Sequence, residues 1–306
     1  MRTVLIGAVG GTEIVLRAMN ECGHPPALLA TFEPGLGRRR HGDYVDLAPL
    51  VAPGTDVVFV DNVNDRDFLD RVAALAPDVI LVIGWSQLVG TELRALARRY
   101  CVGFHPSLLP RMRGRAVLGW TILSGVRETG STLFEIDDGT DTGDILAQAP
   151  VPLDARETVA TLGGKVVDAL HGMIVDLLPR LADGTARATP QPEAGASYCA
   201  KRTPEDSLID WREPAELIDR LIRASTRPYA GAFTFTRKRR VTIWAAEPVE
   251  LEAPYFAGVG QIVLHDDGRP VVRCGDGRFL RLTDVETGDG KPLSGQIRFR
   301  SEPDPS

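Results

Sequence analysis

"DVVFVDNVNDRDFLDRVAALAPDVILVIGW", residues 56–85, is the stretch that decides the fold class. It contains an apolar run at 56–60, a segment of helical periodicity at 66–75, and a second apolar run at 78–85. The second run has almost no polar residue, which is typical of a strand buried on both faces. A strand, a helix and another strand in this order predict a parallel β-α-β unit.

The same alternation continues on both sides of this unit. Apolar strand-like runs and stretches of helical spacing follow one another from the N-terminus to Gly184. We expect strands at 3–9, 26–32, 101–104, 130–136 and 145–153, and helices at 13–22, 91–100 and 158–184. The fold class predicted is therefore α/β, with a doubly wound, mostly parallel, Rossmann-like sheet.

The character of the sequence changes after Gly184. Pro, Ala, Ser and Thr become frequent, as in a linker that runs over a surface. A helix is expected at 214–225, and short strands between Gly, Asp and Pro then suggest a small, OB-like β-barrel or curled antiparallel sheet. We predict an N-terminal domain at 1–190, a linker at 191–211 and a C-terminal domain at 212–306, with a disordered tail at 300–306.

Composition and charge predict a soluble, cytoplasmic protein. The chain has 306 residues, 43% of them apolar, which is enough to bury a core of that size. No apolar run approaches the roughly 20 residues that span a bilayer, and the N-terminus lacks the pattern of a signal peptide. The formal net charge is −6, so nucleic acid is not an expected partner and neither is a membrane.

Four cysteines lie far apart in the sequence, at positions 22, 101, 199 and 274. They form no C-x-x-C pair, so the sequence indicates neither a zinc site nor a disulfide scaffold. Free thiols in a reducing compartment are expected instead.

The glycines after the first predicted strand raise the question of dinucleotide binding. Gly7, Gly10 and Gly11 are spaced G-x-x-G-G, whereas the dinucleotide fingerprint is G-x-G-x-x-G. The spacing favours tight turns between strand and helix over a pyrophosphate site.

The first candidate for chemistry is His105, in "GFHPSLLPRMRGR" at 103–115. The strand predicted at 101–104 delivers it to the carboxyl end of the sheet, where open α/β folds bind their ligands. Pro106 restricts His105 to an extended backbone, and histidine is the usual general acid or base near neutral pH. The alternative is a histidine in a basic surface loop.

The second candidate is the acidic loop "DDGTDTGD" at 137–144. Its carboxylates could be metal ligands, solvated turn residues, or partners that orient His105. The order of residues lacks the alternation and the terminal Glu of an EF-hand, which argues against calcium.

The two motifs together closely resemble the formyltransferases that use N10-formyltetrahydrofolate. This family carries a catalytic His in an H-x-S-L-L-P loop and an Asp in a D-x-G-x-D-T/S-G-D loop. The matching residues here are His105 and Asp141, 36 positions apart, and the resemblance covers most of the chain. It implies that a neutral substrate amine attacks the formyl carbon through a tetrahedral intermediate, with His105 and Asp141 catalytic and no metal.

Further segments resemble particular branches of the family. "SYCAKRTPEDSLIDW" at 197–211 and "RPYAGAFTF" at 227–235 resemble the linker and C-terminal domain of methionyl-tRNA and UDP-4-amino-4-deoxy-arabinose formyltransferases. "HGDYVDLAPL" at 41–50 and "GWSQLVG" at 84–90 resemble the amino-sugar branch more. A nucleotide-linked amino sugar is therefore the expected acceptor class.

The resemblance also implies where the ligands bind. The folate pterin is expected near Trp85, Ser86, Gln87 and Leu88, and along Asp137, Asp138 and Gly139. Trp85 could equally be a core aromatic residue. Arg115, Ser107 and Gly103 are expected on the substrate side, since guanidinium pairs well with phosphate, although Ser107 could instead cap its own turn.

One position departs from the family pattern. The family usually has an Asn two residues before the catalytic His, and this chain has Gly103. That Asn normally holds the oxyanion, and loss of such a donor costs on the order of 10² to 10³ in rate. The remaining donors would be His105, backbone N–H groups and an ordered water.

Four functions therefore remain open for this chain. The favoured one is N-formyl transfer to a small amine, and the others are methionyl-tRNA formylation, hydrolysis of formyltetrahydrofolate, and folate or nucleotide binding without catalysis. The sequence leaves the identity of the amine open. A barrel edge or an apolar helix face could serve as a homodimer interface.

Overall fold

The computed structural model describes residues 1–40, 42–237, 239–293, 295 and 297–302. Contacts divide the chain into two compact units that are not continuous in sequence. Met1–Val117, Glu128–Leu153 and Gly163–Cys199 form the N-terminal unit, and Leu118–Arg127, Asp154–Leu162 and Ala200–Ser306 form the C-terminal unit. The segment that we predict as a linker, 191–211, is thus shared between the two. No helix in the described part of the chain is long and apolar enough to cross a membrane.

The N-terminal unit is built on a sheet whose described strands number seven, in the order β3-β2-β1-β4-β5-β7-β8. The first five in chain order pair in parallel, and the last two are antiparallel. The strands are β1 (Thr3–Ile6), β2 (Leu28–Thr31), β3 (Asp56–Phe59), β4 (Val79–Val82), β5 (Tyr100–His105), β7 (Glu128–Glu135) and β8 (Ile145–Pro152). This architecture confirms the predicted α/β fold class.

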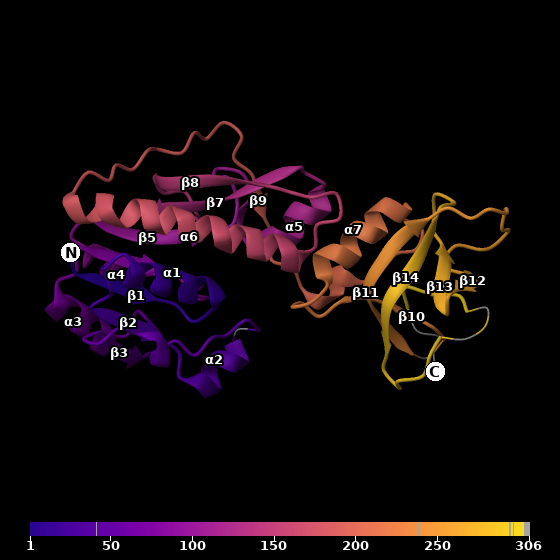
Figure 1. Ribbon diagram of the computed structural model, residues 1–306, viewed down its shortest axis with the longest axis horizontal. Coiled ribbons are helices and arrows are strands. Elements are labelled where there is room, and N and C mark those ends of the chain that lie inside the picture. Colours follow the sequence, from indigo (N-terminus) through magenta and orange to yellow (C-terminus); the bar gives the residue numbers. More distant parts are fainter. Residues whose placement is uncertain (41, 238, 294, 296, 303–306) are drawn as a thin grey trace. The chain divides into compact units, whose positions relative to one another are not determined.

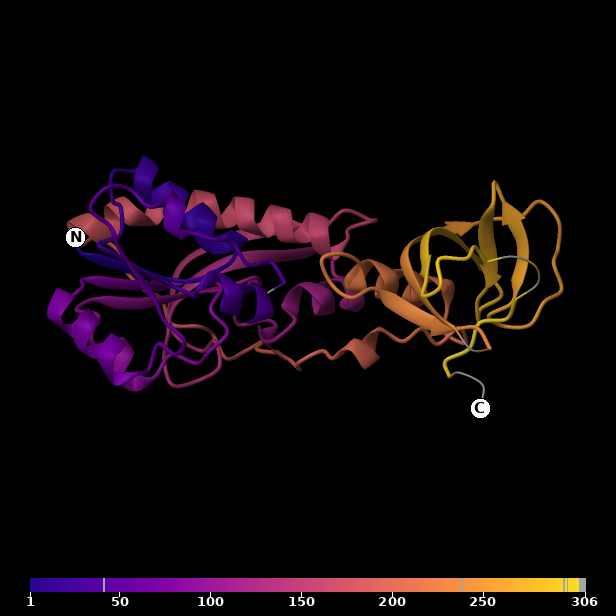
Figure 2. The same cartoon turned by 90° about the horizontal axis from the view of Figure 1, so that it is seen from below.

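Helices cover both faces of the sheet (Figures 1 and 2). On one face, α1 (Gly10–Glu21) and α6 (Val159–Asp183) bury their apolar side chains against the strands. On the other face, α3 (Arg66–Leu75) and α4 (Thr91–Ala95) do the same. Strand β4 lies between the two layers with all its residues buried, which explains its continuous apolar sequence.

Three helices differ from the sequence prediction, the third being a short helix at 34–40 that was not predicted. The helix predicted at 91–100 ends at Ala95, because the amides of Arg98 and Arg99 bond to the carbonyls of Pro77 and Asp78 and lead the chain into β5. The helix α5 (Val117–Ser124) was not predicted, since its sequence is apolar on every side and has no amphipathic period. A short helix, α2 (Pro34–Arg40), follows β2.

Gly7 serves packing at the turn between β1 and α1. A Cβ at this position would lie 2.1 Å from the carbonyl oxygen of Ile83 and 2.3 Å from Oγ1 of Thr12. The close approach of two backbone segments therefore explains this glycine without a bound dinucleotide.

The C-terminal unit contains an antiparallel sheet whose described strands number five, in the order β10-β11-β14-β13-β12. The helix α7 (Ala215–Ser225) packs its apolar face into the same core. The strands are β10 (Ala232–Phe235), β11 (Arg240–Val249), β12 (Ile262–Asp266), β13 (Arg269–Arg273) and β14 (Phe279–Thr287).

The end of the chain closes this sheet. Arg300 and Phe235, on the edge strand β10, exchange backbone hydrogen bonds of 2.8 and 2.9 Å. On the opposite edge, the Phe299 amide donates to Gly260 and the Ile262 amide to the carbonyl of Ile297, each at 2.8 Å. The prediction of disorder is therefore wrong for Arg300, while residues 303–306 of that tail lie outside the described part.

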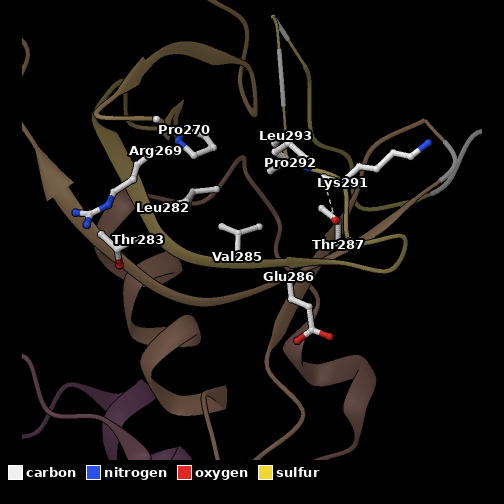
Figure 3. Close-up of a pocket in the computed structure, with 12 residues that line it drawn as sticks. Arg269, Pro270, Leu282, Thr283, Val285, Glu286, Thr287, Lys291, Pro292 and Leu293 are labelled. Carbon is white, nitrogen blue, oxygen red and sulfur yellow. Dashed lines mark hydrogen bonds between the residues drawn. The ribbon is translucent and has the colours of Figure 1, made fainter.

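A groove of about 400 Å³ lies on this sheet beside β13 and β14 (Figure 3). Apolar side chains from both strands and from the segment after β14 line it, including Leu282, Val285 and Pro292. The charged ends of Lys291 and Glu286 point away from its centre, so its interior is mainly apolar.

The closure of the C-terminal sheet predicts the effect of truncating Phe299. Its ring is buried and stacks on Trp211 with centroids 5.3 Å apart. We expect Phe299→Ala to reduce the free energy of unfolding of this unit by about 3–5 kcal/mol. Denaturant unfolding measures the change, with the exposed Phe256→Ala as the control that alters it little. Equal effects of the two variants would contradict the closure.

Burial predicts different reactivities for the four thiols. It raises the pKa of Cys101 and of Cys274 from 9.0 to about 12, so both stay protonated at pH 8. A thiol reagent at pH 8 should modify the partly exposed Cys22 and Cys199 first and the other two only upon unfolding. Since the unfolded thiols ionise near pH 9 and the folded ones do not, stability should also fall as the pH rises above 9. Equal reaction rates of the four thiols would contradict the first prediction, and a stability that does not fall above pH 9 would contradict the second.

Candidate active site

His105 is the last residue of β5, at the carboxyl end of the parallel strands. Its side chain is almost fully buried, with 4% of the residue exposed. Nε2 lies 2.7 Å from the carbonyl oxygen of Met112. A carbonyl only accepts hydrogen bonds, so this contact requires a hydrogen on Nε2 and leaves Nδ1 to face the acidic loop.

Asp141 provides the oxygen that Nδ1 faces. Its Oδ2 lies 3.4 Å from His105 Nδ1 and accepts a 2.8 Å hydrogen bond from the Gly114 amide. Asp141 has φ 54°, a left-handed conformation that is uncommon outside glycine and that Asp tolerates better than most residues. The turn thus directs this carboxylate at the histidine and at the loop that follows it.

The other carboxylates of the acidic loop have different partners. Asp137 completes its own turn by accepting from the Thr142 hydroxyl at 2.8 Å and the Gly139 amide at 3.1 Å. Asp138 forms an ion pair with Arg94, which lowers the pKa of that carboxyl. Because the side chains diverge, the described residues contain no cluster of three or more metal-binding groups.

The residues expected around a pterin comprise Trp85, which stacks on another aromatic ring, and the three residues that follow it. Trp85 stacks on Phe32 with centroids 4.0 Å apart, and its buried Nε1 has no hydrogen-bond partner in the described structure. Ser86 is exposed, Leu88 is 90% exposed, and Gln87 is held by the Val63 amide and the Asp61 carbonyl. Trp85 is thus both packed against an aromatic neighbour and provided with a free donor.

Arg94 connects this loop with the acidic loop. Besides its ion pair with Asp138, it bonds to Thr91 Oγ1 at 2.9 Å and to the Ile136 carbonyl at 3.5 Å. The structure therefore brings 85–91 and 136–138 together, although they are about 50 residues apart in sequence.

Arg115 and Ser107 have contrasting environments. The Arg115 side chain is exposed, and its amide donates to the Cys199 carbonyl at 3.1 Å. Ser107 is 1% exposed, and its hydroxyl donates to the Arg111 carbonyl at 2.6 Å within the same loop. Ser107 thus caps its own turn, which the sequence left open as the alternative to contact with a ligand.

The structure places Arg113, one of the basic residues that follow His105, in an environment that the sequence did not indicate. Arg113 is completely buried, and its guanidinium bonds to Gln191, Glu193 and the Tyr198 hydroxyl. These partners lie 78 to 85 residues away in the segment predicted as a linker. No periodic pattern connects such distant positions, so only the fold could identify the partners of this arginine.

Comparison with known proteins agrees with this architecture. A sequence model described as formyl transferase matches residues 50–178, and one described as the formyl transferase C-terminal domain matches 201–302. The chain belongs to the formyl transferase family. The two matches cover parts of both units, and the second match includes the whole C-terminal sheet.

Solved structures similar to this formyl transferase share its fold. HypX from Aquifex aeolicus has a TM-score of 0.64 and 20% identity over 92% of this chain, which spans only 43% of the HypX chain. WlaRD, a sugar 3N-formyl transferase, has a TM-score of 0.70 and 15% identity over 94% and 98% of the two chains. An N-formyltransferase from Helicobacter canadensis in complex with folinic acid and dTDP-3-aminofucose has a TM-score of 0.67 and 14% identity over 92% and 99%.

Gly103 of this formyl transferase lies directly opposite Phe134 in the β5–β7 pair, on the same face as His105. A Cβ at 103 would lie 3.0 Å from the Phe134 ring and 3.0 Å from Cγ1 of Ile136. Both Gly103 and Phe134 are buried. The volume that a side chain at 103 would enter is therefore filled by these two neighbours, and Gly103 offers no side-chain donor to a ligand.

This packing predicts that restoring an amide at 103 is costly by itself. Gly103→Asn should reduce the free energy of unfolding by about 1–3 kcal/mol, because the Phe134 ring must move. The double variant Gly103→Asn/Phe134→Leu should recover most of the loss. Denaturant unfolding measures both, with Gly164→Asn as the control at an exposed glycine that has open space around it. Wild-type stability of the single variant would refute the packing argument.

Proposed function

We propose that this chain transfers the formyl group of N10-formyltetrahydrofolate to the amine of a nucleotide-linked amino sugar. The observation that carries the proposal is the contact between His105 and Asp141, at the carboxyl end of the sheet in a chain of the formyl transferase family. The direct contact of a buried histidine with a carboxylate is the arrangement that general acid–base catalysis uses.

In this proposal each residue has a separate task. The transfer forms one C–N bond, breaks another, and moves one proton from the substrate amine to the departing nitrogen. His105 carries that proton, and Asp141 stabilises the positive charge that develops on the ring. The Gly114 amide holds the Asp141 carboxylate by a 2.8 Å bond, so the pair keeps its orientation through the reaction. For His105 Nε2 to accept the proton of the amine, its bond to the Met112 carbonyl has to break and the ring hydrogen has to shift to Nδ1, where Asp141 accepts it.

The residues present fit a folate. N10-formyltetrahydrofolate supplies the electrophilic formyl carbon when it is bound. Trp85 offers a flat aromatic surface and an unpartnered Nε1 donor, and the exposed Leu88 adds apolar area beside it. Backbone groups at 137–139 would read the edge of the pterin, since Asp137 and Asp138 use their carboxylates within the protein.

Arg115 supports an anionic acceptor. Its exposed guanidinium follows Gly114, the residue that holds Asp141, and a guanidinium binds phosphate through paired hydrogen bonds. Two similar structures come from N-formyl transferases with dTDP or a dTDP-amino sugar in their crystals. A nucleotide sugar unites these features, because its diphosphate would meet Arg115 while its amine faces His105.

Methionyl-tRNA is a weaker candidate for the acceptor. Residues 200–306 contain 17 Lys and Arg and 17 Asp and Glu, so this part of the chain has no basic excess. Arg227 and Arg239 form ion pairs with Asp284 and Asp289, and Arg240 lies over the Phe233 ring. A tRNA-binding face would need a broad area of unpaired cations.

The proposal predicts the behaviour of His105→Ala and Asp141→Asn. With N10-formyltetrahydrofolate and dTDP-3-aminofucose as probes, we expect turnover to fall by about 10²- to 10⁴-fold in each, because proton transfer loses its carrier or its orientation. Release of tetrahydrofolate and mass of the sugar product measure it. His171→Ala, at a histidine that is 43% exposed, is the matched control and should retain wild-type turnover.

The same assay separates the alternative functions. Formate release without an amine would indicate hydrolysis, and formylation of methionyl-tRNA alone would indicate the other acceptor class. Near-wild-type turnover of His105→Ala would overturn the assignment of the proton carrier.

A further inference from the structure

The segment 191–199, hereafter the strap, runs across the loop that follows His105. The Arg113 amide donates to the Ser197 carbonyl at 2.8 Å, and the Met112 amide to the Ser197 hydroxyl at 2.9 Å. Two short strands, β6 (Arg113–Gly114) and β9 (Tyr198–Cys199), pair in parallel at this point. The strap thus holds the backbone of Gly114, the residue that anchors Asp141.

Gln191 links the strap to Asp141 itself. Its Nε2 donates to the Asp141 carbonyl at 2.9 Å and to the Gly143 carbonyl at 2.6 Å. Its Oε1 accepts from Arg113 Nη2 at 2.9 Å and from Arg113 Nε at 3.2 Å. One amide therefore joins the acidic loop to the loop of the histidine.

The orientation of this amide has a single solution. An arginine only donates hydrogen bonds and backbone carbonyls only accept them, so Oε1 must face Arg113 and Nε2 must face the loop. Arg113 is fully buried, and a buried charge needs hydrogen-bond partners. Gln191 Oε1 is one of the acceptors that its guanidinium uses. A glutamine at 191 is thus chemically specified from both sides.

Asp141 requires such support because of its backbone. Its left-handed φ of 54° is less stable than an ordinary turn conformation for a residue with a side chain, and it determines where the carboxylate points. Gln191 bonds to the carbonyl of Asp141 itself and to that of Gly143, two residues later in the same turn. Gly143 lies close against the backbone of Glu135, since a Cβ at 143 would lie 1.7 Å from the Glu135 carbonyl oxygen.

We propose that Gln191 is a positioning residue, which keeps the Asp141 carboxylate against His105 by holding the Asp141 and Gly143 carbonyls. This inference rests on the proposed function, in which the His105–Asp141 pair transfers the proton. Gln191 acts through Asp141 and contacts no reacting group.

Two variants separate the two sides of the amide. Gln191→Leu removes all four hydrogen bonds, whereas Gln191→Glu keeps an acceptor for Arg113 and loses both donors to the acidic loop. We expect kcat to fall by about 10- to 100-fold in both, since a displacement of about 1 Å at a catalytic group has effects of this size. KM for the nucleotide sugar should stay within about threefold, because the ligand contacts are unchanged.

A readout without ligands tests the same inference. The ¹⁵N chemical shifts of the His105 ring report its contact with Asp141. They should change in Gln191→Glu in the same direction as in Asp141→Asn, in the protein without folate or sugar. The control is Glu193→Gln, in the same strap and on the Arg113 side of the network, which should leave the His105 shifts and kcat at wild-type values. Thermal unfolding of each variant checks that the protein is folded.

Two outcomes are distinguishable. If Gln191→Glu folds and keeps the wild-type kcat and His105 shifts while His105→Ala is inactive, the positioning role is overturned and the proposed function stands. If His105→Ala keeps its turnover, the proposed function fails, and the ring shifts alone then decide whether Gln191 positions Asp141.

Discussion

Asp141 is the point at which three distant segments meet. Its carboxylate faces His105 at the end of β5 and accepts from Gly114, and its carbonyl accepts from Gln191. These contacts span 36, 27 and 50 residues of sequence, so the site forms only when these three segments are folded together. A left-handed backbone at one residue thus controls the geometry of the His105–Asp141 pair.

The electrostatics of the acidic loop follow from this arrangement. Four carboxylates in eight residues would repel one another, yet each of the first three has its own cation or hydrogen-bond donor. Glu135, beside the loop, behaves differently. Burial raises the pKa of its carboxyl, and the negative charges of Asp144 and Asp137 raise it further. Because these carboxylates have separate partners and point in different directions, a loop so rich in Asp can form an ordered turn.

The sequence predicted those parts of the structure whose signals are local. The continuous apolar run at 79–82 identified the central strand, and the alternation of strands and helices identified the sheet. His105 and Asp141 could be found because motif and spacing coincide. The strap could not, because its pairing with the histidine loop involves only two residues per strand, and its Pro- and Ser-rich composition resembles that of a linker. Helix α5 escaped for a similar reason, since an evenly apolar segment has no period.

The packing of Phe134 over Gly103 also constrains how such a protein can change by mutation. A side chain introduced at 103 meets the Phe134 ring and Ile136 at 3.0 Å, so its effect depends on what already occupies position 134. The two positions are therefore epistatic, and a smaller residue at 134 has to come first for an amide at 103 to be acceptable. We therefore expect any path of single substitutions that introduces an amide at 103 to pass through a less stable protein.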